Sequence, residues 1–188
     1  MDHSQDNLQL HVFPREHAGV MLRPMMMEDA EDLLPLLSAP GVYEGLVSIP
    51  RNPDIDFARL RTKDICDNMA EGKGLQLIGE LDGTIVGTIG IGINWKHRHA
   101  GLGYHLDEHA RGKGIASRML QGMAEHCFEQ LKLHRIWAET FLDNEPSRQL
   151  LKRNGFIFEG VKRAAYLKEE HFRDVDVWAL TADDPRPW

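Results

Sequence analysis

A glycine-rich turn at residues 111–116 joins a strand-like run, residues 102–106, to an amphipathic segment, residues 115–131. Apolar residues recur at every fourth position of that segment, which is helical spacing. The chain is therefore expected to run from a strand through a short turn into a long helix. Glycines let a ligand come close to the backbone, and the first N–H groups of a helix lack intrahelical partners, so the turn predicts a site for an anion such as a diphosphate.

The rest of the sequence alternates between helical and strand periods. Helices are expected over residues 28–37, from a cap at Asp54 or Asp56 to about residue 71, and over residues 144–154, with Gly155 as C-terminal cap. The expected strands are residues 20–23, 75–81, 84–93, 100–106, 134–140, 156–161 and 175–180. In one of these strands a single face is expected to hold Ile85, Ile89, Ile91 and Ile93.

This order of elements predicts an α+β fold, a sheet with helices on both faces. The chain has 188 residues, no internal repeat and no obvious linker, which favours a single domain over residues 1–188. Residues 1–19 are interpreted as an N-terminal arm.

The composition indicates the cellular compartment and the general class of the protein. Hydrophobic residues make up 42% and charged residues 27% of the chain, which is an ordinary globular balance, and no apolar run is long enough for a membrane span. The first residues are polar and acidic, unlike a signal peptide. The two cysteines, Cys66 and Cys127, form no disulfide framework, and Cys127 is expected to be a buried thiol. The default expectation is a cytoplasmic protein without membrane attachment.

The formal net charge of −7 argues against nucleic-acid binding, which needs clustered Lys and Arg. It suits a cationic substrate or a basic partner, or it serves solubility alone. Residues 95–99 contain two histidines, but without a third ligand nearby they predict no metal site. A loop near the active site and a homodimer contact are the two interpretations kept for that segment.

The glycine turn lacks the spacing of a dinucleotide fingerprint and the Gly-Lys-Ser/Thr ending of an ATPase phosphate loop. Its pattern is Arg-x-x-Gly-x-Ala after a strand, followed by Asn144-x-x-Ser147 and by Asn154-Gly155-Phe156. With these motifs the chain resembles the GNAT superfamily of acetyl-CoA-dependent N-acetyltransferases. His134-Arg135-Ile136 and Glu159-Gly160 resemble the RimJ/RimL branch, which acetylates the N-terminal amino group of ribosomal proteins.

The resemblance implies a mixed, mainly antiparallel sheet of about six to seven strands, splayed where acetyl-CoA inserts. The coenzyme A diphosphate would lie on the backbone N–H groups of the glycine turn. The pantetheine arm would pair with residues 103–106 in a slot between Leu106 and the strand at Ile136. The implied cofactor-binding residues are Leu106, Arg111, Gly112, Lys113, Gly114, Ile115, Ala116, Asn144 and Ser147.

The resemblance also implies catalytic roles. The backbone N–H of Leu106 would polarise the thioester carbonyl, and Ser147 would donate a proton to the leaving thiolate. Asn144 would bond the pantetheine region, and as the cap of the following helix it has a structural role as well.

One position departs from the RimL pattern. The glutamate proposed as general base in those enzymes corresponds to Ala165 here. An N-terminal α-amine has a pKa near 8, so a water chain is one alternative. The other candidates for the base are His99, His105, Glu139 and Tyr166.

These observations predict direct transfer of an acetyl group from acetyl-CoA to a primary amine. The resemblance favours a protein N-terminal α-amine, such as that of a ribosomal protein. A polyamine or an antibiotic amine is an alternative acceptor, and an acetyl-CoA-binding protein without catalysis is an alternative of another class.

Overall fold

Eight strands form one sheet in the computed structural model, which describes residues 8–188. The sheet order is β1-β2-β3-β4-β5-β6-β8-β7, and every neighbouring pair is antiparallel except β5 with β6. The mixed, mainly antiparallel sheet is confirmed, and it has more strands than the six to seven expected. The strands are β1 (Arg15–His17), β2 (Val20–Pro24), β3 (Gly74–Leu81), β4 (Thr84–Asn94), β5 (His99–Leu106), β6 (Arg135–Phe141), β7 (Ile157–Lys168) and β8 (His171–Thr181).

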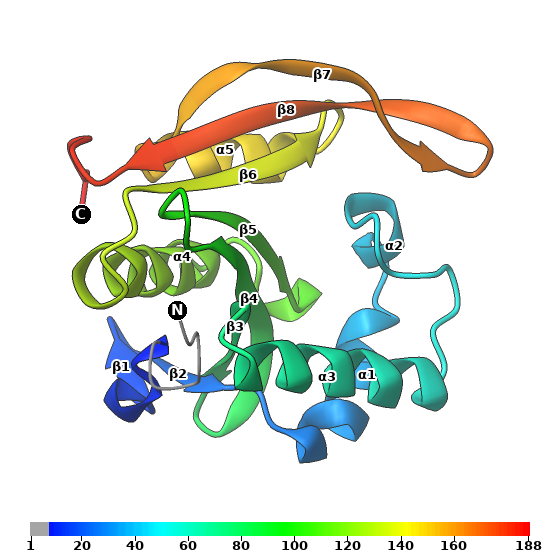
Figure 1. Cartoon of the computed structure of the whole chain (residues 1–188). Helices are drawn as coiled ribbons and strands as arrows, with labels where there is room; N and C mark the ends of the chain where they lie inside the picture. Colours follow the sequence, from blue (N-terminus) through cyan, green and yellow to red (C-terminus); the bar gives the residue numbers. More distant parts are fainter. Residues whose placement is uncertain (1–7) are drawn as a thin grey trace.

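The helices cover both faces of the sheet (Figure 1), as expected. They are α1 (Ala30–Leu37), α2 (Val42–Gly45), α3 (Ile55–Ala70), α4 (Ile115–Glu125) and α5 (Glu145–Arg153), with short turns η2 (Leu10–Val12), η3 (Met27–Asp29), η4 (Glu108–Ala110) and η5 (His126–Gln130). The segment expected as one helix to residue 131 changes to a π-helix at His126. Cys127 is fully buried there, and burial raises the pKa of its thiol to about 12.

Two clusters of buried side chains hold the helices on the sheet. The larger cluster joins α4 to the strands through Ile115, Met119 and Met123. The smaller one joins α1 and α3 to Ile78 of β3 on the opposite face. Each fully buried side chain of this kind contributes about 1.5–3 kcal/mol to the free energy of unfolding.

A β-bulge in β4 separates Ile85 from the other isoleucines of the strand. Gly79 lies opposite Gly87, whereas the next residue of β3, Glu80, lies opposite Ile85, so Val86 is an extra residue. One extra residue inverts the alternation of side chains along a strand. Ile85 therefore packs with the α1/α3 cluster while Ile89 packs with the α4 cluster, and the expectation of one shared face is wrong at Ile85.

The segment interpreted as an N-terminal arm is attached to the fold in the part that the structure describes. Leu8 is fully buried, its carbonyl oxygen lies 2.9 Å from His126 Nε2, and β1 pairs with β2. Residues 1–7 of the expected arm lie outside the described residues. A three-residue strand is too short for an alternating pattern to reveal it in the sequence.

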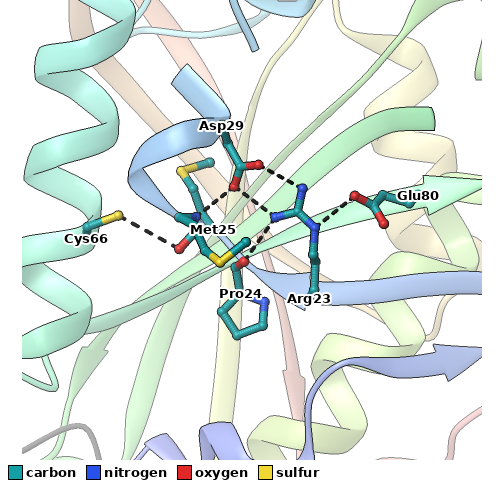
Figure 2. Close-up of polar contacts among 7 residues, drawn as sticks. Arg23, Pro24, Met25, Asp29, Cys66 and Glu80 are labelled. Atoms are coloured by element: carbon teal, nitrogen blue, oxygen red, sulfur yellow. Dashed lines mark hydrogen bonds and ion pairs between the residues drawn. The ribbon is translucent and has the colours of Figure 1, made fainter. Parts of the chain in front are cut away.

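An ion-pair network fixes the connection from β2 into α1 (Figure 2). Arg23 donates to both carboxylate oxygens of Asp29, at 2.7 and 2.8 Å, and to Glu80 Oε1 at 2.8 Å. These bonds hold the pKa of the Arg23 guanidinium above its usual value. Asp29 also accepts from the Met26 N–H at 2.7 Å, which fixes the start of the helical region.

Candidate active site

The glycine turn places two left-handed residues before α4. Gly112 has φ +75° and Gly114 has φ +74°, a region of backbone space that favours glycine. Gly114 is the N-cap of α4, and no side chain bonds the free N–H groups of the first turn. A methyl group at Gly112 would meet no atom within 4 Å. The start of α4 thus combines unpaired N–H groups with open space, the arrangement that binds anions.

The cations expected beside this turn are Arg111 and Lys113. Arg111 Nη2 lies 3.5 Å from the Leu106 carbonyl oxygen, and a methyl group at Gly41 would lie 3.8 Å from Arg111 Nη1. The Arg111 side chain is therefore directed to the loop before α2. Arg118 lies beside the turn instead, with Nη2 2.8 Å from the Lys113 carbonyl oxygen. Sequence analysis missed Arg118, although its position four residues after Gly114 puts it one helical turn from the cap.

The sheet opens between β5 and β6. Pairing is limited to residues 99–102 of β5 with residues 135–138 of β6, so residues 103–106 have no partner on that side. The expected split is confirmed (Figure 1). The N–H of Asp107 donates to Val86 of β4 at 2.9 Å, and successive N–H groups of a strand point to opposite sides. The N–H of Leu106 therefore faces the split.

Asn144 and Ser147 stand at the other side of the split. Asn144 Oδ1 accepts from the Ser147 N–H at 3.2 Å, so the expected N-cap role of Asn144 is confirmed. Its amide nitrogen faces α2, 3.4 Å from where a methyl group at Gly45 would lie. Burial raises the pKa of Tyr104 to about 12, and the nearby Ser147 hydroxyl offsets part of that rise. Ser147 of α5 and Tyr104 of β5 therefore lie near each other across the split, although the buried Tyr104 hydroxyl has no hydrogen-bond partner among residues 8–188.

A cavity of about 460 Å³ lies beside the split, on the face that α1 and α3 cover. Glycines of β5 expose its floor, aromatic side chains of β6 and β7 form its walls, and the α2 segment closes one side. Its lining includes Gly45, Leu46, Val47, Gly101, Gly103, Trp137, Glu139, Phe141, Tyr166 and Val175.

Glu139 is the acid that lines this cavity. Its Oε2 accepts a hydrogen bond of 2.6 Å from the Tyr166 hydroxyl, and its Oε1 pairs with Lys162. The bond to Glu139, with burial, raises the pKa of Tyr166 to about 12, so the phenol stays protonated at neutral pH. The Glu139 side chain is 9% exposed. Each of its oxygens can accept one more hydrogen bond.

Ala165 offers no acid or base, as expected from its methyl side chain. It lies in a bulge of β7, where the register with β8 shifts between Lys162 and Tyr166. Ala164 has φ +50°, and its N–H donates to Asp174 Oδ1 at 2.8 Å. The bulge brings Tyr166 to Glu139.

The two histidine candidates lie elsewhere. His99 is at the opposite end of β5 from Leu106, where its ring stacks on His97 with centroids 6.1 Å apart. His105 Nδ1 lies 3.1 Å from Thr88 Oγ1. Burial, together with Arg61 and Arg111, lowers the pKa of His105 to about 4, so the ring is neutral at pH 7.

The β7–β8 hairpin reaches across to α2 (Figure 1). Lys168 donates to the Leu46 carbonyl oxygen at 2.8 Å and also to that of Tyr43. Glu169 accepts from the Tyr43 hydroxyl at 3.1 Å and pairs with Arg51. These bonds tie the wall made by the α2 segment to the wall made by β7. The predicted strand at residues 156–161 ends before the hairpin, so the sequence did not reveal this connection.

In the described range, residues 8–188, no cluster of three His, Cys, Asp or Glu side chains is placed to hold a metal ion. No helix in that range is both long and apolar enough to cross a membrane.

Comparison with known proteins adds a family match over residues 20–157, to the acetyltransferase (GNAT) domain. L-amino acid N-acetyltransferase AaaT of Escherichia coli K12 is 26% identical over 82% of this chain and 93% of its own length. Ribosomal-protein-serine acetyltransferase of the same organism is 36% identical over 46% of this chain and 49% of its own. The solved structure of Mycobacterium smegmatis RimJ in complex with CoA-disulfide superposes with a TM-score of 0.77 at 28% identity, covering 87% of this chain and 82% of that one.

Proposed function

The chain belongs to the GNAT acetyltransferase family and is an acetyl-CoA-dependent N-acetyltransferase, and from that premise we propose that its acceptor is the N-terminal α-amine of a protein. Relatives named as RimJ and as ribosomal-protein-serine acetyltransferase support a ribosomal protein as that acceptor. The charges around the cavity next to the split are the observation that favours this acceptor over a polyamine.

The residues at the turn and the split fit coenzyme A. The uncapped start of α4 offers N–H groups of residues 112–116 to a diphosphate, with Lys113 and Arg118 beside it. The unpaired edge of β5 offers residues 103–106 to the amides of the pantetheine arm. Asn144 presents an amide at the same opening. The Arg111 side chain lies between the Leu106 carbonyl and the loop before α2.

Acetyl-CoA supplies an acetyl group already activated as a thioester. The Leu106 N–H donates a hydrogen bond to the carbonyl oxygen as negative charge develops on it. Glu139 accepts the proton that the amine loses as the N–C bond forms. Ser147 donates to the sulfur as the C–S bond breaks, with Tyr104 beside it.

The cavity suits a single positive charge. Among the described residues that line it, Glu139 is the only acid, and Lys162 and Lys168 lie close by. A polyamine would bring several positive charges to one carboxylate and these lysines, which like-charge repulsion disfavours. A peptide N-terminus carries one ammonium group on a neutral backbone and matches this arrangement.

Thiol release from acetyl-CoA tests the proposal. Peptides that begin with Ser, Ala or Met are compared with spermidine, and the same peptides with an acetylated N-terminus serve as matched controls. We expect free peptides to stimulate release, with spermidine and the blocked peptides near background. Release with spermidine alone would replace the acceptor, and binding of acetyl-CoA without stimulation by any amine would favour the non-catalytic alternative.

A further inference from the structure

Two arginines near the cavity have neutral partners only. Arg61 of α3 donates to Ser48 Oγ at 3.3 Å, and Arg111 Nη2 lies 3.5 Å from the Leu106 carbonyl oxygen. In the described part of the chain neither forms an ion pair with a carboxylate. Burial lowers the pKa of Arg61, with no acid acting against it. Arg61 is half-buried and Arg111 is exposed. A half-buried cation without a counter-ion is costly in a folded protein, so Arg61 points to a ligand, which the exposed Arg111 can reach as well.

His105 precedes Leu106, whose carbonyl oxygen Arg111 contacts, and the charges of Arg61 and Arg111 both help to lower the pKa of His105. Its Nε2 atom is buried and has no hydrogen-bond partner among residues 8–188. Nδ1 lies 3.1 Å from Thr88 Oγ1. When the Thr88 hydroxyl donates to Nδ1, the hydrogen of the neutral ring is on Nε2. Arg61, Arg111 and His105 then offer hydrogen-bond donors and no acceptor, and two of these three side chains are charged.

The position of this group relates it to the acceptor. Arg111 contacts the carbonyl of Leu106, the residue whose N–H faces the split. Gly41 and Ser48, beside Arg111 and Arg61, bracket the α2 segment that lines the cavity. An anion bound here would lie next to the site of amine attack.

The diphosphate of coenzyme A is not that anion. Its proposed site is the start of α4, whereas Arg61 comes from α3, which packs on the opposite face of the sheet. The anion must therefore arrive with the acceptor. Arginine forks fit carboxylates in planar, two-bond geometry.

We propose that Arg61, Arg111 and His105 form a subsite for a carboxylate that the acceptor carries close to its reacting amine. The subsite rests on the proposed function. Two sources share this chemistry: an acidic side chain at the second position of an N-terminal segment, and the α-carboxylate of a free amino acid.

Two matched acceptor pairs test the subsite and separate the sources. One pair is a peptide that begins Ser-Asp and its Ser-Asn counterpart, and the other is a free L-amino acid and its amide. In one pair we expect wild-type kcat/KM to favour the acid about tenfold, through KM, because one charged hydrogen bond is of that size. The preference should shrink as salt is added.

Arg61→Gln should abolish the preference and leave kcat/KM for the neutral member unchanged, which also reports a folded enzyme. Arg59→Gln is the matched control, since Arg59 lies on the same helix but is exposed and paired with Glu31 at 2.6 Å. It should keep the preference.

The outcomes distinguish the two proposals. Transfer without preference in the wild type, or a preference that survives Arg61→Gln, overturns the subsite alone. Preference confined to the amino-acid pair supports the subsite and replaces the protein N-terminus as acceptor. Absence of transfer to all four compounds overturns the proposed function and the subsite together.

Discussion

The hydroxyl of Ser147 takes no part in capping its own helix. Its backbone N–H donates to the Asn144 cap, and its side chain lies near Tyr104 across the split. A serine in the first turn of a helix is common, so the family resemblance and the position of Ser147 beside the split are what make it a candidate for catalysis.

We predict that Ser147→Ala lowers kcat on the order of 100-fold, because the leaving thiolate loses its donor. The acetyl-CoA dissociation constant should stay nearly the same, since the cap bond uses the backbone. Steady-state kinetics and a binding titration measure both quantities. Ser38→Ala, an exposed serine of another helix, is the control. Unchanged turnover would remove Ser147 from the catalytic residues.

Glu139 combines a carboxylate with a place on the cavity wall, which Ala165 cannot provide. We predict that Glu139→Gln lowers kcat by about 100-fold at pH 7, because the amine loses its proton acceptor. The loss should shrink at pH 9, where an amine with a pKa near 8 is mostly neutral.

A pH profile of kcat/KM for both enzymes measures this loss. Glu159→Gln, which breaks another ion pair at the sheet, should follow the wild-type profile. A loss that is the same at pH 7 and pH 9 would contradict proton transfer to Glu139.

At the scale of elements, the strand–turn–helix unit forms the site that we propose for the coenzyme diphosphate. The glycines at positions 112 and 114 hold left-handed conformations, and the strand before them ends at the split. The unit is contiguous in the chain, which is why the sequence predicts it.

We predict that Gly114→Glu weakens acetyl-CoA binding by more than about tenfold, because a carboxylate would face the diphosphate at the start of α4. A side chain at a left-handed position also costs about 1–2 kcal/mol of stability. Gly83→Glu is the matched control, since Gly83 has φ +75° in a distant hairpin with open space around it. Equal coenzyme affinity in the two variants would refute the site.

The β7–β8 hairpin and α2 act together as a second unit. Lys168 and Glu169 join them, and both walls of the cavity depend on that contact. The residues involved are more than 100 positions apart, so no local pattern predicts it.

At the scale of the molecule, net charge and local charge differ. The chain carries −7 overall, yet Lys162, Lys168, Arg61 and Arg111 gather around the acceptor cavity. A substrate with several positive charges, which the net charge suits, is therefore not what the cavity favours. Fields inside a low-dielectric site depend on the nearest groups more than on the total.

Two histidines make the stability of the whole fold depend on pH. Burial lowers the pKa of both His105 and His126 to about 4, below the unfolded value near 6.5. Between those values the unfolded chain binds more protons than the native state, so stability falls as pH drops from 6.5 to 4. We predict a contribution of about 3 kcal/mol from His126, whose side chain is fully buried.

Urea unfolding at pH 7, 5.5 and 4.5 measures this effect. His126→Gln removes the titration and keeps a donor for the Leu8 carbonyl, so its stability should depend less on pH. His109→Gln, an exposed histidine, should match the wild type. Parallel pH curves for wild type and His126→Gln would contradict the prediction.

The α+β class, most element bounds and the glycine turn follow from the sequence alone. These are short-range properties, because period and capping act over one or two turns of chain. The sequence did not predict the bulge at Val86 or the bulge before Tyr166, because a register shift depends on the partner strand.

Which side chains lie together depends on the tertiary structure. It joins Glu139 to Tyr166 by a hydrogen bond, places Ser147 near Tyr104, and puts His105 within the electrostatic influence of Arg61 and Arg111. Most of these residues belong to elements that lie far apart in the chain. Proton transfer and ligand selection depend on distances of a few ångströms between such groups. The proposed coenzyme site is thus contiguous in the sequence, whereas the proposed acceptor site depends on how the sheet splits and which elements fold over it.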